Sequence, residues 1–134
     1  MLRIYPGDRD PEWVTSTLGV RPTSTNRKGE QYTNSIGRVR TTPKNAWFLS
    51  SEGKVASKDV RRHLDWLLDS LSAAEEHVRK LADDESVSMD VVCVWWSAAG
   101  HGGPVLSSSQ MSRLVDLKLE LGFDVYFFGD DEEE

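Results

Sequence analysis

Seven apolar residues recur at alternating spacings of four and three, and this repeat constrains the fold more than any other feature of the chain. They are Val60, Leu64, Leu67, Leu71, Ala74, Val78 and Leu81. Such spacings place them in one stripe along a helix. We expect that helix to begin at Ser57 and to end at Asp83, on the order of 40 Å further along its axis. The segment SAAE, Ser72–Glu75, has the spacing of a capping box and could mark a kink or a restart.

Two runs of apolar and aromatic residues predict strands for this helix to pack against. They are VSMDVVCVWW, Val87–Trp96, and FDVYFF, Phe123–Phe128. Side chains alternate between the two faces of a strand, so Trp96 in the first run and Tyr126 and Phe128 in the second fall on half-polar faces. If the two strands are neighbours, these three rings form one aromatic patch.

An aromatic patch of this kind has two interpretations. It can stack bases or hold an apolar ligand. Alternatively, it is covered by the first helix through Trp13, or by a polar flap through Tyr32. Monomers seldom leave large apolar patches bare, so the sequence favours a cover.

Turn and capping residues define the shorter elements. The segment LRIYP, Leu2–Pro6, predicts a strand, and AWFLSS, Ala46–Ser51, predicts another. Asp10 and Pro11 are typical of a helix start, and Gly19 of its end.

The segment Thr23–Lys44 is polar and rich in turn residues, and we expect an exposed hairpin or long flap there. Tyr32, Ile36 and Val39 are the residues that could anchor it.

A further helix is predicted after the glycine-rich loop. Ser107 and Gln110 have capping-box spacing, and we expect the helix to end at Gly122. Its apolar face would consist of Met111, Leu114, Leu117 and Leu121.

The order of these elements predicts an α+β domain of two layers. We expect a predominantly antiparallel or mixed sheet of about four to five strands, with one long and two shorter helices packed on it, in partly ferredoxin-like order. Residues 1–129 would form a single domain. The acidic run Asp130–Glu134 would be a disordered tail.

Composition narrows the class of protein. No window approaches the length of apolar residues that a membrane span needs, and the first ten residues lack the apolar region of a secretion signal, so we expect a cytoplasmic protein without membrane association. The chain has one cysteine, Cys93, in an apolar run, and His63 and His77 are too far apart on the helix to share an ion. Neither a metal nor a cofactor is expected.

Charge is unevenly distributed. The net charge is -6, yet the segment Gly19–Asn45 has six basic residues and one acid, so it carries +5 and the rest of the chain carries -11. Affinity for phosphates comes from a basic face, and this chain offers one only in that segment. Nucleic acid is therefore the least favoured partner.

A small-molecule site could lie between the basic flap and the glycine-rich loop AAGHGGP. Arg27, Lys28 and His101 could surround an anion there, with Trp96 as a wall. The loop has neither P-loop spacing nor a GxSxG elbow, so nucleotide binding and serine hydrolysis lack their usual motifs. An exposed loop histidine is the favoured interpretation of His101.

The chain resembles a known family through several segments: DPEWVTSTLGVRPT, RKGE, AWFLSS, HLDWLLDSL and VVCVWWSAAGHGGPVLSSSQMSRLVDLKLELGFDVYF. These resemble a family of mostly bacterial proteins, domain of unknown function 4279. The resemblance runs over almost the whole chain, except for the acidic tail. It implies a stand-alone cytoplasmic α+β domain without an assigned activity and without family site residues.

Three functions remain open. The preferred one is a non-enzymatic module that binds another protein, in the manner of an immunity or antitoxin-type partner of a basic toxin. The second is a small anionic-ligand site, binding or hydrolytic, at Arg27, Lys28, Trp96 and His101. The third is single-stranded nucleic acid on the aromatic face of Trp96, Tyr126 and Phe128.

Overall fold

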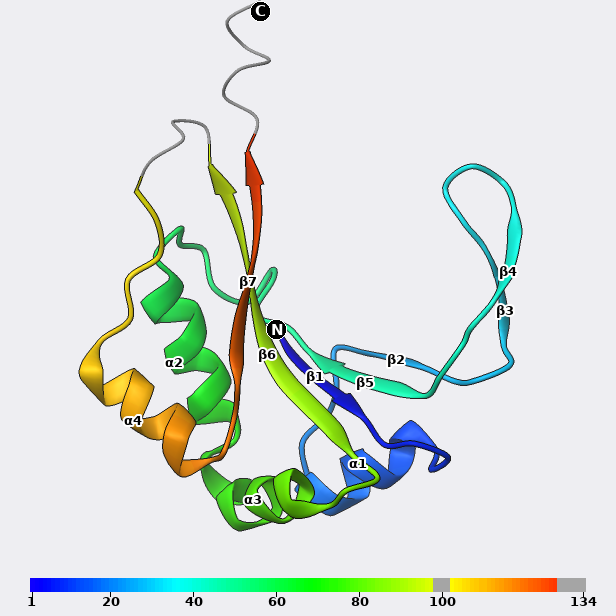
Figure 1. The fold of residues 1–134 in the computed structure, drawn as a ribbon, viewed down its shortest axis with the longest axis horizontal. Helices are drawn as coiled ribbons and strands as arrows, with labels where there is room; N and C mark the ends of the chain where they lie inside the picture. The colour runs from blue at the N-terminus through cyan, green and yellow to red at the C-terminus, as the bar shows by residue number, and fades with distance from the viewer. Residues whose placement is uncertain (98–101, 128–134) are drawn as a thin grey trace, which may run out of the picture.

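Five strands form the central sheet in a computed structural model of the chain, which describes residues 1–97 and 102–127 (Figure 1). Their spatial order is β2 (Ser24–Asn26), β5 (Ala46–Leu49), β1 (Leu2–Tyr5), β6 (Ser88–Ser97) and β7 (Leu121–Phe127). The first four strands pair in antiparallel fashion, whereas β6 and β7 are parallel. Parallel neighbours need a crossover connection, and helix α4 (Ser108–Asp116) lies in it. The α+β class with a mixed sheet is therefore confirmed.

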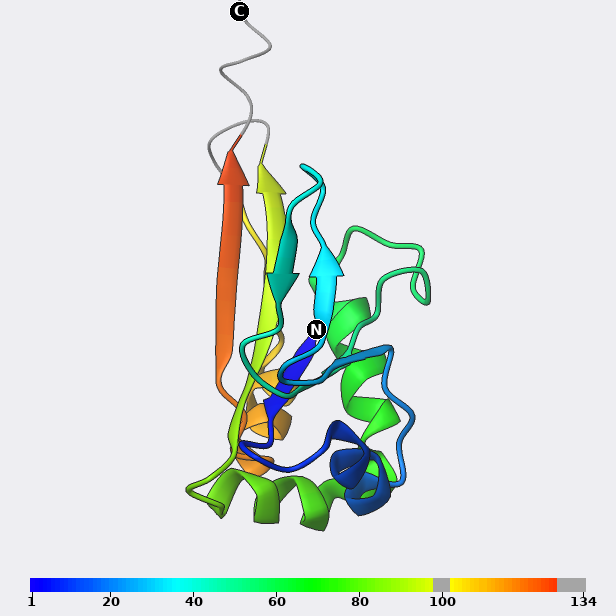
Figure 2. The same cartoon turned by 90° about the vertical axis from the view of Figure 1, so that its right-hand side faces the viewer.

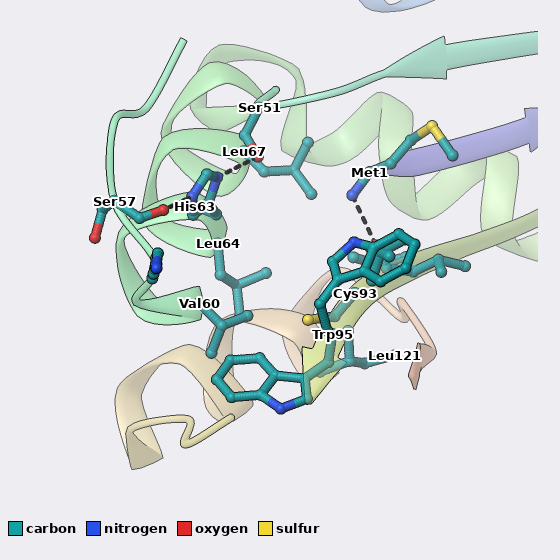
Figure 3. Close-up of a pocket in the computed structure, with 15 residues that line it drawn as sticks. Met1, Ser51, Ser57, Val60, His63, Leu64, Leu67, Cys93, Trp95 and Leu121 are labelled. Atoms are coloured by element: carbon teal, nitrogen blue, oxygen red, sulfur yellow. Dashed lines mark hydrogen bonds between the residues drawn. The ribbon is translucent and has the colours of Figure 1, made fainter. Parts of the chain in front are cut away.

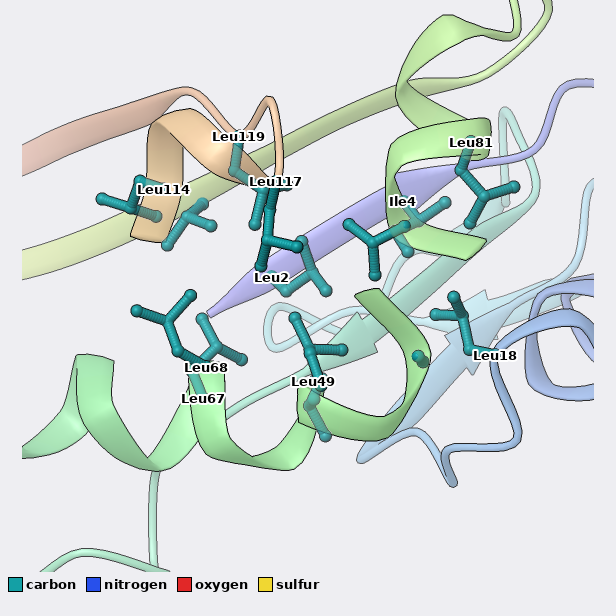
Figure 4. Packing of buried hydrophobic residues seen from close by; sticks show 14 of the residues in the cluster. Leu2, Ile4, Leu18, Leu49, Leu67, Leu68, Leu81, Leu114, Leu117 and Leu119 are labelled. Atoms are coloured by element: carbon teal, nitrogen blue, oxygen red, sulfur yellow. The ribbon is translucent and has the colours of Figure 1, made fainter. Parts of the chain in front are cut away.

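Helices pack on one face of this sheet and form the core with it (Figures 1 and 4). The strands contribute alternate residues, such as Leu2, Ile4 and Val91, to one cluster of buried side chains. Helices α1 (Pro11–Leu18), α2 (Val60–Ser70), α3 (Glu75–Asp83) and α4 contribute to the same cluster. The opposite face is more polar: there Arg3 forms a two-point ion pair with Asp90, with N–O distances of 2.8 and 2.6 Å.

The long helix predicted from the apolar stripe is divided in two. Helix α2 ends at Ser70, a 3₁₀ turn covers Ser72–Ala74, and α3 follows. Leu71, Ala74 and Val78 are all buried, so the stripe was assigned correctly, and the break falls at Ser72–Glu75, where the capping-box spacing had indicated a possible restart. Because of the break, the two halves of the stripe pack against different elements: α2 packs beside α4, whereas α3 contacts α1 and β6.

The start of α2 also differs from the prediction. Asp59, not Ser57, is the N-cap, and its carboxylate accepts a hydrogen bond from the backbone N–H of Arg61. Ser57 lies two residues earlier, where its hydroxyl accepts a hydrogen bond from the backbone N–H of Asp59. By contrast, the predicted caps of α1 at Asp10 and Gly19 are confirmed.

The capping box of Ser107 and Gln110 is confirmed, but the end predicted for α4 is wrong. The helix ends at Asp116, because Lys118 has a left-handed backbone with φ of 58°. Gly122 belongs to β7, where it pairs with Val92, and Met111 is exposed.

The polar segment contains the predicted hairpin, made of β3 (Gln31–Thr33) and β4 (Val39–Thr41). Figure 1 shows it projecting away from the helices. The predicted anchors are wrong, because Tyr32, Ile36 and Val39 are all exposed. Contacts at the base hold the hairpin instead: the Asn45 side chain accepts a bond from the Lys28 N–H and donates one to the Gly7 carbonyl.

We predict that replacing Leu68 with alanine lowers the free energy of unfolding by about 2–5 kcal/mol. Leu68 is 1% exposed in the middle of α2, so truncation leaves a cavity (Figure 4). Val115→Ala on α4 is the matched control, because Val115 is 76% exposed, and it should change stability by less than about 0.5 kcal/mol. Urea denaturation followed by circular dichroism measures both, and equal values would contradict this description of the core.

Candidate functional site

Two strands of the sheet continue beyond their neighbours. Strand β1 pairs with only the first part of β6, from Ser88 to Val91. Beyond that point β6 remains paired with β7 up to Ser97 and Phe127. Residues 92–97 and 122–127 therefore form a two-stranded extension, here called the β6–β7 arm, which projects past the rest of the sheet (Figures 1 and 2).

Large hydrophobic side chains are exposed on both faces of the β6–β7 arm. They are Val94, Trp96, Phe123, Val125, Tyr126 and Phe127. Strand β7 is also the last strand of the sheet, and within the described ranges nothing pairs with its outer edge. Exposed apolar patches and unpaired strand edges are features of interaction surfaces.

The aromatic patch predicted from strand alternation is confirmed for two of its three rings. Trp96 and Tyr126 are opposite each other in the register of β6 and β7, and their rings stack with centroids 4.6 Å apart and an interplanar angle of 21°. The third predicted member, Phe128, lies outside the described residues.

The predicted cover over this patch is wrong. Trp96 is 64% exposed and Tyr126 44%. Trp13 packs against the core, beneath the guanidinium of Arg9, and Tyr32 is exposed in the projecting hairpin. Neither of the two proposed covering residues therefore shields the rings.

The phenol of Tyr126 is hydrogen-bonded to a carboxylate on the same strand. The Tyr126 hydroxyl donates a 2.9 Å hydrogen bond to Asp124, two residues earlier and thus on the same face of β7. This bond favours the neutral phenol, and together with the negative charge of Asp124 it raises the pKa of Tyr126 above its ordinary value. The patch therefore has an acidic border.

A cavity of about 550 Å³ lies between α2 and β6, next to the base of the arm (Figure 3). Most of its wall is apolar and comes from the first turns of α2 and from the helix side of β6. These wall residues include Val60, Leu64, Leu67, Val91, Cys93, Trp95 and Leu121. Burial raises the pKa of the Cys93 thiol, so this cysteine is an uncharged part of the wall.

The polar part of the wall centres on His63. Its Nε2 lies 2.6 Å from the Ser57 carbonyl oxygen, which can only accept a hydrogen bond, so Nε2 carries the hydrogen. In the neutral ring Nδ1 then accepts the hydrogen bond from the Ser51 hydroxyl, at 2.7 Å. The imidazole thus ties the loop before α2 to the helix. Sequence reasoning missed this group, because Ser51, Ser57 and His63 form no spaced motif.

Arg27 and Lys28 lie elsewhere in the molecule. They follow β2, which is separated from β6 by β5 and β1, so the structure does not bring them together with Trp96. The Arg27 guanidinium pairs with Asp10 at 3.1 Å and lowers the pKa of that carboxyl. The fourth residue of the predicted anion site, His101, lies outside the described residues.

Two further properties concern the described parts of the chain. Residues 1–97 and 102–127 contain no group of three His, Cys, Asp or Glu side chains that could hold a metal ion. No helix there has the length and apolar character needed to cross a membrane.

These features define a two-layer α+β domain with a five-stranded mixed sheet, a projecting apolar arm and a cavity at the base of that arm. The family model described as "Domain of unknown function (DUF4279)" matches residues 1–128, and the chain belongs to this family. No curated protein and no solved structure matches the chain.

We predict that Asp124→Asn lowers the pKa of Tyr126. The wild-type carboxylate stabilises the neutral phenol, so removing its charge makes ionisation easier and moves one tyrosine transition to lower pH. Absorbance at 295 nm during a pH titration measures this transition. Tyr126→Phe, which removes the transition, identifies it among the three tyrosines. An unchanged or raised pKa in Asp124→Asn would contradict the hydrogen bond.

Proposed function

We propose that this protein is a non-enzymatic protein-binding module of the bacterial cytoplasm, and that the β6–β7 arm is its binding surface. The partner is a protein that presents an extended, apolar segment with basic flanks. The observation that carries the proposal is the exposure of six large hydrophobic side chains on a strand pair whose outer edge is unpaired among the described residues.

The unpaired edge favours an extended segment as the occupant. A strand added beside β7 would satisfy the outward backbone groups through main-chain hydrogen bonds. Because β7 exposes Val125 and Phe127 on one face and Tyr126 on the other, both faces of the added strand would find apolar contacts. Aromatic residues such as Trp96 and Tyr126 are enriched in protein interfaces.

The charge of this region favours a basic partner. The last fourteen residues of the sequence, from Leu121 onward, contain six acids and no basic residue. A basic partner would be attracted to this acidic sequence, whereas a nucleic acid or a second copy of charge -6 would be repelled. This acidity supports a role like that of an immunity or antitoxin-type protein, which neutralises a basic toxin by covering it.

A matched pair of variants tests the proposal. Val125→Arg places a positive charge in the β6–β7 arm, and Val115→Arg makes the same change at an exposed valine on α4. Tagged full-length protein is incubated at low salt with lysate of its host. We expect the wild type and Val115→Arg to retain the same basic polypeptide, and Val125→Arg to retain at least about tenfold less of it.

Equal retention by all three proteins would contradict the proposal. Analytical sedimentation of the purified proteins tests whether a second copy of this chain occupies the β6–β7 arm instead. A wild-type dimer that Val125→Arg dissociates would assign the arm to a second copy of this chain and overturn the basic partner.

A further inference from the structure

We propose that the cavity between α2 and β6 binds a small amphipathic carboxylic acid, with its hydrocarbon body against the apolar wall and its carboxylate near Lys58. This site shares Val94 and Trp96 with the β6–β7 arm, whereas Val125, the residue that tests the arm, does not line the cavity. The proposal joins three observations: the origin of the cavity, the absence of acids from its wall and the placement of its polar groups.

The cavity originates from the unequal lengths of the strands. Beside Ser88–Val91, strand β1 completes the sheet, and helix residues such as Leu68 fill the space above it. Beyond Val92, which exchanges backbone hydrogen bonds with Met1, no strand lies on the β1 side of β6, and Cys93 and Trp95 line the cavity. The resulting volume, about 550 Å³, is in the range of ligand pockets, roughly 300–1,000 Å³.

The wall of the cavity differs in charge from the rest of the protein. The chain has 22 acids, yet none of the residues that line the cavity is aspartate or glutamate. Lys58 lies at its rim, exposed, and forms no salt bridge with the acids that the structure describes. The wall has two cationic groups, Lys58 and the Met1 amino group, and no anion, which favours a negatively charged ligand.

Apart from the Met1 amino group, which donates a hydrogen bond to the Val92 carbonyl, the polar side chains gather on one side of the cavity. Figure 3 shows Ser51, Ser57 and His63 at one side, with Trp95 and Leu121 across from them. The bond from His63 Nε2 to the Ser57 carbonyl fixes the imidazole, which in turn positions the Ser51 hydroxyl. Lys58 supplies the positive charge for a carboxylate, whereas the Ser51 hydroxyl already donates its one hydrogen to His63 Nδ1. A cavity with a polar wall facing an apolar wall suits an amphipathic molecule that has a carboxylate at one end and a hydrocarbon chain at the other.

Isothermal titration calorimetry with decanoate, kept below its micelle concentration, tests the site. We expect one saturable site in the wild type. Lys58→Glu should weaken decanoate binding by at least about tenfold. Lys54→Glu is the matched control, because Lys54 is exposed in the same loop and does not line the cavity, and it should bind decanoate like the wild type. Decan-1-ol, which has the tail without the charge, should bind more weakly than decanoate and should not distinguish Lys58→Glu from wild type.

Three results would overturn the proposal: no saturable binding by the wild type, equal weakening by both lysine variants, or decanol binding as tight as decanoate binding. Val60→Trp provides an independent test of location, because a large ring at this lining position fills the cavity. It should abolish decanoate binding with the helical circular dichroism retained, and full binding by the folded variant would also overturn the site. Val125→Arg should leave decanoate affinity unchanged, so this test and that of the protein partner have separate outcomes.

Discussion

The pairing of a four-residue strand with a ten-residue strand determines most of what is distinctive in this molecule. Strand β1 pairs with β6 only from Ser88 to Val91, and Met1 adds backbone hydrogen bonds to Val92. From Cys93 to Ser97, β6 pairs with β7 alone, through the parallel register that α4 makes possible. One mismatch of lengths therefore produces both the projecting arm and the cavity beside it. In the arm, large hydrophobic side chains stay exposed because no third strand and no helix among the described residues covers them.

The core could be predicted well from the sequence, because burial leaves a periodic signal. The stripe on α2 and α3 and the alternation in β6 both identified residues that are buried in the structure, such as Leu71 and Val91. Continuity is harder to predict, since the 3₁₀ turn at Ser72–Ala74 preserves the spacing of the stripe, and the capping-box spacing of Ser72–Glu75 was the sign of a restart. Likewise, Lys118 ends α4 through a left-handed backbone that glycine or asparagine usually supplies, and a lysine gives no such signal.

The candidate sites differ in how far they could be predicted. Trp96 and Tyr126 were identifiable because strand alternation and adjacency are enough to bring two rings together. The exposure of the two rings could not be predicted, because it depends on where the hairpin and α1 pack. The cavity could not be predicted either, since it requires knowing where β1 stops along β6. Ser51 and His63 come from a loop and a helix whose meeting depends on tertiary structure, and neither carries a motif.

The central position of β1 has a consequence for how the chain is made. This strand leaves the ribosome before the other strands of the sheet, yet its neighbours are β5 and β6, and the ion pair from Arg3 to Asp90 spans 87 residues of sequence. Contacts of such long range form slowly. During synthesis β1 is therefore made well before the strands that flank it, and Leu2 and Ile4 stay exposed until most of the chain exists. A newly made copy thus passes through a period in which its most buried strand needs protection from other chains.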